Sequence, residues 1–493
     1  MGMTDAPRTK QGIIIAALAG AVSFCLAACD VNRGPKSPVS GAGGGAATET
    51  APIDSGAAGP ALTSNSSAPS VPPPRAGSTP QGGTPKTTVL AGSQLATARQ
   101  QLTEGGSPQL QAALAILTKG ADVALTAGPW SVIDKQSAPP SGDKHDYMSQ
   151  APYWWPADAS PPGNPGTLGK CPYKKWDGLR NKREVDPPAL TDATHLKKTF
   201  EGIFQLALAW YYTGEERYAA RAEVFARRWF LEPATLMRPN MNFAQGVPCA
   251  VPGRGAGIIE ASSPYIGDLV DGLAILDQGA PGWTPSDQTG VRAWLSQFLD
   301  WLRTSPVGLE ESKPPDERNN HESWYDAAVA SLAVYLDQPK VAEAALQDGM
   351  ALIDLQIDRD GAQPMELGRT MAWHYSNFNG HALCRLAEVG RNIGVDLWTH
   401  KNRSGASLAT AIDYMLEGGL RGRSGFKLLS KSPAQVGDFD PSEVFYEVHA
   451  AAAEAKDANA AAALPQLTPP EGVDMWPLVS SCRVAGKLMT AKN

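Results

Sequence analysis

Basic residues are in deficit in this chain of 493 residues: 43 lysines and arginines stand against 50 aspartates and glutamates, a formal net charge of −7. This balance argues against nucleic acid as a partner, and a polyanionic ligand would require a local basic site. One segment between 170 and 183 is a candidate for such a site, with a solvated basic loop as the equal alternative. Its basic residues are Lys170, Lys174, Lys175, Arg180, Lys182 and Arg183.

Cysteine is also scarce. Two of the six cysteines lie near the N-terminus, and the others are Cys171, Cys249, Cys384 and Cys482. Their spacing matches no zinc motif. An exported protein permits disulfides, and four cysteines allow three pairings. The sequence favours none of these pairings and leaves free buried thiols open.

The N-terminus has no apolar run long enough to span a bilayer comfortably. A positively charged start precedes a short apolar run at 13–24, which is typical of an export signal. Leu26-Ala27-Ala28-Cys29 then resembles the lipobox of bacterial lipoproteins, in which the cysteine is lipidated. We therefore expect residues 1–29 to be a lipoprotein signal peptide, with an ordinary signal peptide and a chance cysteine as the alternative. The expected location is the periplasm or cell envelope of a Gram-negative-type bacterium, with membrane contact only through the lipid on Cys29.

Large apolar side chains are few between 30 and 88, where Gly, Ala, Pro, Ser and Thr dominate. Such a segment cannot bury enough surface to offset its ordering entropy, so we predict a disordered tether. The remaining residues, 89–493, are numerous enough for one large domain or two smaller ones. We expect one domain over these residues.

Strand patterns are sparse, since no segment shows sustained alternation, whereas helical spacing recurs. Thr194–Tyr212 and Glu215–Phe230 flank Thr213-Gly214 and predict an αα-hairpin. No fixed repeat period is present, which disfavours a repeat scaffold. We predict an all-α fold, an α/α barrel (toroid) of antiparallel helical hairpins with long cleft-forming loops. Further helices are expected at 94–102, 108–127, 263–277, 286–303, 321–336, 340–357, 377–393, 407–416 and 441–455.

Two loop regions carry candidate substrate-binding side chains. A proline-punctuated segment holds aromatic rings, which suit stacking on the flat C–H face of a sugar; the alternative is that they close the end of a helical bundle. Glycine-rich loops hold polar groups able to bond sugar hydroxyls or to satisfy their own loops. Because these glycines follow no strand, phosphate binding is not indicated. The candidates are Tyr147, Tyr153, Trp154, Trp155, Asn242, Gln245 and Arg254.

A polar constellation opens one predicted helix and continues some fifty residues later. Its two amides, imidazole, guanidinium and phenol suit the gripping of a carboxylate and the movement of a proton beside it. In a 1,4-linked uronate, neutralising the carboxylate stabilises the enolate-like state formed when the C5 proton leaves. A tyrosine near positive charge can take that proton and then protonate O4. This scheme requires no metal and no cofactor. The residues are Asn319, Asn320, His321, Glu366, Arg369, His374 and Tyr375.

Each member of this constellation also has a structural alternative. Asn319 and Asn320 can cap the helix that follows, and His321 can be a satisfied first-turn residue. Arg369 can pair with Glu366 at helical spacing. Tyr375 can pack in the core.

These motifs resemble the alginate lyase domain family of polysaccharide lyases, most closely polysaccharide lyase family 38. The likeness spans about 140–400 and rests on Asn319-Asn320-His321 before Trp324, on Glu366-Leu-x-Arg369-Thr-x-x-Trp373-His374-Tyr375, and on the segments 145–156, 241–245 and 253–260. In family 5 the catalytic tyrosine falls one place later, where this chain has Ser376. The resemblance implies an α/α barrel and β-elimination on β-1,4-linked uronates.

Carried over residue by residue, the resemblance implies that Asn320 and His321 neutralise the carboxylate, with His321 as a possible second base. It also implies that Arg369 stabilises the charge and that Tyr375 moves the proton. The aromatic segment would form a lid or subsite wall. We predict a lyase acting on an anionic polysaccharide, either the poly-mannuronate of alginate or glucuronan. The alternatives are a non-catalytic uronate-binding lipoprotein and an α/α-barrel hydrolase, which would need two opposed carboxylates. The available acids, Glu260, Glu322 and Glu366, form no convincing pair.

Overall fold

The computed structural model describes residues 83–157, 166–167, 171–181, 189–312, 318–427, 437 and 439–482. The predicted signal peptide, Cys29 and most of the predicted tether lie outside these residues, as do Lys170, Lys182 and Arg183. Within the described ranges, none of the helices has the length and apolarity that a membrane crossing requires.

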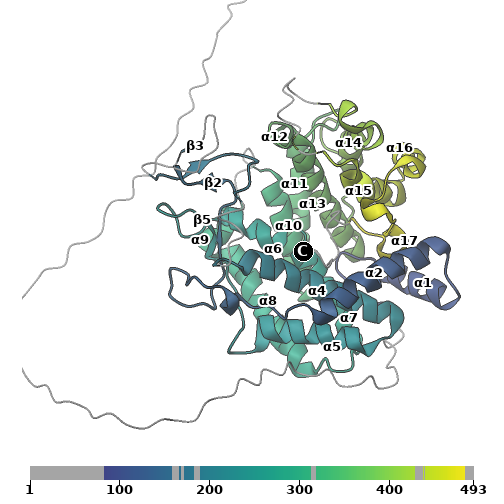
Figure 1. The fold of residues 1–493 in the computed structure, drawn as a ribbon. Helices are drawn as coiled ribbons and strands as arrows, with labels where there is room; N and C mark the ends of the chain where they lie inside the picture. The colour runs from purple at the N-terminus through teal and green to yellow at the C-terminus, as the bar shows by residue number, and fades with distance from the viewer. Residues whose placement is uncertain are drawn as a thin grey trace, which may run out of the picture. The chain divides into compact units, whose positions relative to one another are not determined.

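The predicted all-α class is confirmed, and Figure 1 shows helices packed on one another with only short strands beside them. The longer helices are α1 (Gly92–Thr103), α2 (Pro108–Thr126), α4 (Asp192–Thr213), α5 (Glu216–Ala226), α7 (Tyr265–Leu276), α8 (Pro285–Thr304), α10 (Asn320–Tyr335), α11 (Pro339–Gln356), α13 (Ala372–Ile393) and α14 (Leu408–Arg421). The shorter ones are α6 (Ile259–Ser262), α9 (Pro306–Leu309), α12 (Pro364–Leu367), α15 (Phe445–Ala450), α16 (Ala458–Ala463) and α17 (Trp476–Val479).

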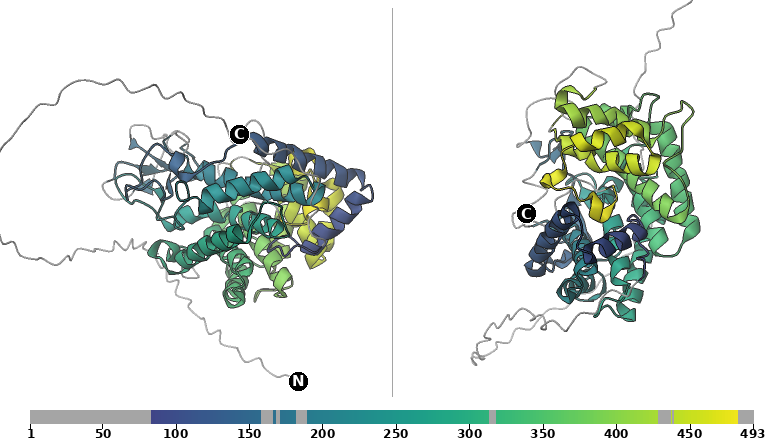
Figure 2. Two further views of the ribbon diagram at one scale, coloured as in Figure 1. Left: turned by 90° about the horizontal axis from the view of Figure 1, so that it is seen from below. Right: turned by 90° about the vertical axis from the view of Figure 1, so that its right-hand side faces the viewer.

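The helices form an α/α toroid built from antiparallel neighbours. The predicted hairpin is α4 and α5, joined at Gly214, whose φ of 73° is a left-handed conformation that favours glycine. Packing then runs from α2 to α4, α7, α10 and α13, and on to α14 and α15. The C-terminal α17 contacts α1 and α2, and Figure 2 shows the yellow C-terminal helices beside the dark-blue N-terminal pair.

Most residues of the inner helices α4, α7, α10 and α13 are buried, and α10 is buried on nearly all sides, which is why its sequence is not amphipathic. The helix expected at 377–393 begins at Ala372. Trp373 is fully buried against Phe426 and Phe439, and this packing extends the helix toward its N-terminus. His374 and Tyr375 therefore lie in the first turn of α13.

Short strands arrange the loops at one side of the toroid (Figure 1). Strand β1 (Met148–Gln150) pairs in parallel with β5 (Phe243–Gly246), while β4 (Lys174–Lys175) pairs with β2 (Trp154–Trp155) and β3 (Gly166–Thr167). Strands of two to four residues are too short to show alternation, so no sequence pattern predicts them. Their pairing joins segments separated by up to a hundred residues.

The four cysteines form two disulfides, Cys171–Cys249 and Cys384–Cys482. This is one of the three pairings that the sequence left open. The first joins the segment before β4 to the loop after β5, and the second joins α13 to the residues after α17. Both therefore close long stretches of chain, with sequence separations of 78 and 98 residues.

The folded part begins a few residues before Val89. Thr87 and Thr88 are buried. The Asp271 carboxylate of α7 accepts the Leu90 backbone N–H at 2.8 Å and the Thr88 hydroxyl at 2.9 Å. The composition of the preceding segment hid this boundary, because threonines that bond a buried carboxylate look like tether residues in the sequence.

Candidate active site

Asn319 is the N-cap of α10. Its Oδ1 accepts the backbone N–H of His321 at 2.9 Å, and its own carbonyl accepts a bond from Gln356 at 3.2 Å. The capping alternative is thus confirmed for Asn319. The residue sets the direction of the first helical turn, on which Asn320 and His321 stand.

Asn320 is held by Glu366 of α12. The Glu366 carboxylate accepts the backbone N–H of Asn320 and its Nδ2, each at 2.8 Å, and both residues are 1% exposed. Burial raises the pKa of Glu366, and the two bonds from Asn320 oppose that rise. Glu366, which we expected to bind substrate, instead fixes the orientation of the Asn320 amide.

His321 is oriented by a carboxylate that sequence reasoning missed. Its Nδ1 lies 3.1 Å from Glu311 Oε2, and its ring is 26% exposed whereas the Glu311 side chain is almost fully buried. A histidine held at Nδ1 presents Nε2 as its outward atom. Glu311 lies ten residues upstream in an irregular segment, where no motif marks it.

Arg369 pairs with Asp177, so the structural alternative of a helical ion pair with Glu366 does not hold. Its Nε and Nη2 donate to the two Asp177 carboxylate oxygens at 3.1 and 2.8 Å. Its Cζ lies 3.8 Å from the centre of the Tyr375 ring. The cation is therefore shared between a carboxylate edge and an aromatic face. The sequence did not predict this pairing, because 192 residues separate Asp177 from Arg369.

Tyr375 lies 7% exposed beneath Arg369, and its hydroxyl is 2.6 Å from that of Tyr153. Burial raises the pKa of the Tyr375 phenol, as does Tyr153, while Arg369 lowers it. The next residue, Ser376, is buried at 1% exposure. The contact with Arg369 therefore belongs to Tyr375 and not to the position that aligns with the family 5 tyrosine.

His374 directly precedes Tyr375 in the first turn of α13. Its ring is 5.6 Å from the Tyr375 ring and stacks on Phe378, with 5.6 Å between centroids. Its Nδ1 is 3.0 Å from Glu443 Oε2, and its side chain is 41% exposed. His374 thus remains accessible beside the phenol.

The aromatic segment divides into buried and accessible rings. Tyr147 is fully buried and donates to Glu260 at 2.7 Å, and Trp154 is 6% exposed in a small core with Cys171. Neither is placed for the substrate contact that we expected, because both rings fill the space behind the loop. Tyr153 meets Tyr375, and the indole N–H of Trp155 bonds the Leu179 carbonyl at 3.0 Å.

The glycine-rich loops place Arg254 among carboxylates. Arg254 donates from Nε to the Gln245 carbonyl at 3.0 Å and from Nη2 to Gln245 Oε1 at 2.9 Å. Burial lowers the pKa of Arg254, and Glu260, Glu310 and Glu311 oppose that change. Arg254 and Gln245 thus bond each other and adjoin the acid that orients His321.

The Asn242 side chain bonds a different partner from those of Arg254. It is exposed, and its Oδ1 accepts the indole N–H of Trp301 at 2.9 Å.

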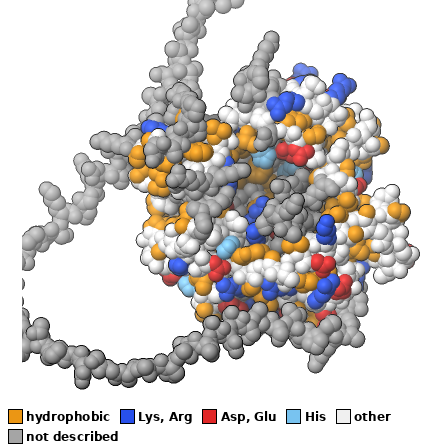
Figure 3. Space-filling view, in the orientation of Figure 1, with side chains coloured by type: hydrophobic (Ala, Val, Ile, Leu, Met, Phe, Trp, Pro, Cys, Tyr) orange, Lys and Arg blue, Asp and Glu red, His pale blue; other side chains and the backbone are white. Residues whose placement is uncertain are grey.

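On the face shown in Figure 3, the described lysines and arginines are dispersed rather than gathered into one basic patch. A polyanion would therefore meet individual cations at this face.

Behind the site, buried amides join the starts of α10 and α13. Asn379 is fully buried and donates to both Gln356 and Gln363 at 2.8 Å. Gln356 in turn bonds the Asn319 carbonyl, and Gln363 bonds the Ser376 carbonyl at 3.1 Å. This network fixes the spacing between the two segments that carry the candidate residues. Single amides scattered over sixty residues give no sequence signal of it.

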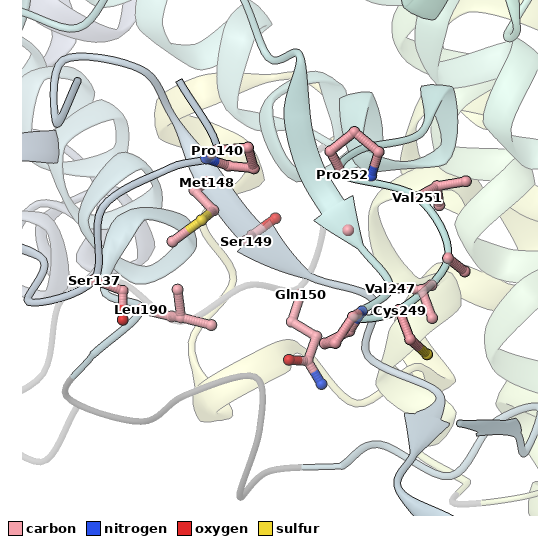
Figure 4. Close-up of a pocket in the computed structure, with 13 residues that line it drawn as sticks. Ser137, Pro140, Met148, Ser149, Gln150, Leu190, Val247, Cys249, Val251 and Pro252 are labelled. Carbon is pink, nitrogen blue, oxygen red and sulfur yellow. The ribbon is translucent and has the colours of Figure 1, made fainter. Parts of the chain in front are cut away.

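A cavity of about 420 Å³ lies beside β1 and the loop after β5, and Figure 4 shows Gln150 and Val251 among its walls. Ser149 also lines it, and the Ser149 hydroxyl bonds Glu260 at 2.5 Å. The cavity thus adjoins the residues that support the site, while Arg369 and Tyr375 are not among its lining residues.

Comparison with known proteins identifies the family of this chain. The family model described as alginate lyase matches residues 131–426, more than half of the chain. The structure of an alginate lyase from Bacteroides ovatus is 28% identical, with a TM-score of 0.68, and the match covers 80% of this chain and 99% of that one. Alginate lyase A1-III from Sphingomonas species A1 is 15% identical, with a TM-score of 0.48 and coverage of 80% and 96%. The search of curated proteins found no match. The chain belongs to the alginate lyase family and is a polysaccharide lyase.

Proposed function

We propose that the protein cleaves β-1,4-linked uronate polymers, either the poly-mannuronate of alginate or glucuronan, by β-elimination. The observation that carries this proposal is one continuous chain of contacts. Asn320 bonds Glu366 at 2.8 Å, the Glu366 carbonyl accepts the Arg369 backbone N–H at 3.0 Å, and the Arg369 guanidinium covers Tyr375. These contacts link the segment of the Asn320 amide to that of the guanidinium and the phenol, although about fifty residues separate the two segments in the sequence.

Asn320 and His321 are the proposed neutralisers of the substrate carboxylate. The Glu366 carboxylate engages one Nδ2 hydrogen of Asn320, which fixes the plane of the amide, and the second hydrogen is the proposed donor to the anion. Glu311 holds the His321 ring at Nδ1, so that Nε2 is the atom offered to substrate. Donors fixed before substrate binds stabilise the developing enolate without reorganisation.

Tyr375 is the proposed acid and base. As phenolate it takes the C5 proton, and the electron pair of that C–H bond becomes the C4–C5 double bond. O4 departs with the pair of the broken C4–O4 bond and takes the proton back from the phenol. Because burial raises the pKa of Tyr375, the phenolate needs a nearby cation, and Arg369 on its ring face supplies one.

An ultraviolet assay tests the reaction class and the polymer together. The protein is incubated with poly-mannuronate, poly-guluronate and glucuronan in turn, and near-ultraviolet absorbance is followed. We expect absorbance to rise with poly-mannuronate or glucuronan, because elimination leaves a C4–C5 unsaturated end. New reducing ends without absorbance would indicate a hydrolase, and binding without either product would indicate a carbohydrate-binding protein. Either result would contradict the proposal.

We also propose that the protein is an exported lipoprotein anchored through Cys29. The two disulfides support export, because such bonds persist in oxidising compartments. In a bacterial host, Cys29→Ala should move the protein from the membrane fraction to the soluble fraction and abolish incorporation of labelled fatty acid. Cys25→Ala is the matched control, since that cysteine lies within the apolar run of the predicted signal. Unchanged membrane association of Cys29→Ala would overturn the anchor.

A further inference from the structure

The edge of the Arg369 guanidinium is held by Asp177 in a two-bond fork, with Nε–Oδ2 at 3.1 Å and Nη2–Oδ1 at 2.8 Å. The two side chains are 23% and 29% exposed, so the pair is partly shielded from water. A fork of this kind sets the plane of a guanidinium as well as its position.

That plane faces the Tyr375 ring, since Cζ of Arg369 lies 3.8 Å from the ring centre. The guanidinium is thus restrained on two sides, by a carboxylate at its edge and by an aromatic ring at its face. A cation over an aromatic face is attracted to the electron-rich ring, and a phenolate ring is richer in electrons than a phenol. The guanidinium over the ring therefore lowers the pKa of Tyr375, whereas the Asp177 charge itself raises it, so a benefit from Asp177 comes only through the placement of Arg369.

The turn that carries Asp177 fits closely against the residue after Arg369. The Thr370 hydroxyl donates to the Asp177 carbonyl at 3.1 Å. Gly178 follows with φ of +75°, and a Cβ at this position would lie 2.3 Å from Thr370 Oγ1. Only glycine permits both this conformation and this approach. The seating of Asp177 is therefore specific and not a chance meeting of surface charges.

The same turn is tied to the residue that meets the Tyr375 hydroxyl. The Trp176 backbone N–H donates to the Tyr153 carbonyl at 2.8 Å. The segment is also joined covalently to the loop after β5 by the Cys171–Cys249 disulfide. One anchored loop thus reaches Tyr375 twice, directly through Tyr153 and indirectly through Asp177.

We propose that Asp177 is a positioning residue of the lyase reaction, whose carboxylate holds the Arg369 guanidinium flat on the Tyr375 ring so that the cation stabilises the phenolate. This inference rests on the proposed role of Tyr375 as acid and base. In this inference Arg369 mainly stabilises the Tyr375 phenolate, and Asn320 and His321 neutralise the substrate carboxylate.

A double-mutant cycle with Arg369 tests the inference. We expect Asp177→Ala to lower kcat by about 10- to 100-fold, as small misplacements of catalytic groups do, while KM changes little. Asp177→Glu should restore part of the loss because it keeps the carboxylate. In an Arg369→Ala background, Asp177→Ala should cost almost nothing more, since Asp177 acts only through Arg369.

The matched control is Asp287→Ala. Asp287 accepts a similar fork from Arg227, at 2.9 and 2.8 Å, and this pair joins α8 to the residues after α5. It should lower the melting temperature and leave kcat unchanged. If Asp177→Ala also lowers the melting temperature and leaves kcat unchanged, Asp177 only stabilises its loop and the inference fails. It also fails if adding Asp177→Ala to Tyr375→Phe tightens the binding of oligo-uronates, because Asp177 would then compete with substrate for Arg369.

The cycle separates this inference from the proposed function. Full activity in Tyr375→Phe would overturn the role of Tyr375, and with it the phenolate that Arg369 is inferred to stabilise. An inactive Tyr375→Phe, combined with independent losses from Asp177→Ala and Arg369→Ala, would leave the proposed function intact and overturn the inference alone.

Discussion

Replacing Tyr375 with phenylalanine should lower kcat by about 10²- to 10⁴-fold, the usual contribution of a general acid–base group. The variant keeps the ring on which Arg369 rests and removes only the hydroxyl that faces Tyr153. Substrate binding should therefore change little, because the proposed grip on the carboxylate comes from Asn320 and His321. The measurements are kcat from ultraviolet absorbance and the affinity for an oligo-uronate from calorimetry.

Tyr153→Phe is the matched control, since it removes the same 2.6 Å hydrogen bond from the opposite partner. It leaves the Tyr375 hydroxyl in place and should cause a clearly smaller loss of kcat. Equal losses in the two variants would mean that the pair of phenols acts as a unit. A larger loss in Tyr153→Phe would indicate that Tyr153 is the acid and base, and the assignment of that role to Tyr375 would be wrong.

The fold was predictable from the sequence because helical periodicity is a local property. The α4–α5 hairpin follows from apolar spacing on both sides of Thr213-Gly214, and the structure places a left-handed glycine there. The N-terminal boundary of α13 was harder to predict from the sequence. Trp373 packs against Phe439, sixty-six residues later, so the extra turn that carries Tyr375 depends on tertiary contact.

The site was only half predictable, for a related reason. Asn320, Arg369 and Tyr375 stand in short motifs with recognisable chemistry, whereas their partners lie elsewhere in the chain. Asp177 and Glu311 occupy irregular segments in which a carboxylate usually serves solubility. Glu366 shows the opposite case: its motif was visible, but its buried bonds to Asn320 give it an orienting role that residue type alone does not reveal. The partners depend on tertiary structure, and a single sequence does not record them.

The exchange of Asn320 for aspartate should be the other large loss. It places a carboxylate where Nδ2 now donates to Glu366 at 2.8 Å, and it removes the donor proposed to face the substrate carboxylate. Loss of one such donor costs about 10²- to 10³-fold in kcat, and an added negative charge repels the uronate further. We expect kcat/KM to fall by at least that factor in the absorbance assay.

Stability should fall in the same variant, by about 1–3 kcal/mol for the broken buried bond. The loss of stability should grow as the pH rises. Burial already raises the pKa of Glu366, and a neighbouring carboxylate raises it further. A carboxyl group whose pKa is raised by folding contributes stability below its unfolded pKa and loses that contribution as pH rises through the folded value. The melting temperature of Asn320→Asp should therefore approach that of the wild type in acid and fall behind it toward neutral pH.

Asn319→Asp is a close control, because it makes the same change one residue earlier. Asn319 caps α10 through Oδ1, and aspartate caps a helix equally well and suits the positive end of its dipole. Its activity should stay far above that of Asn320→Asp, and its melting temperature should hardly move. If the two variants lose activity equally, the start of the helix as a whole is sensitive to charge, and the special role of the Asn320 amide is wrong. If only Asn320→Asp fails, the loss belongs to the Asn320 amide, which bonds Glu366 and is the proposed donor to the substrate carboxylate.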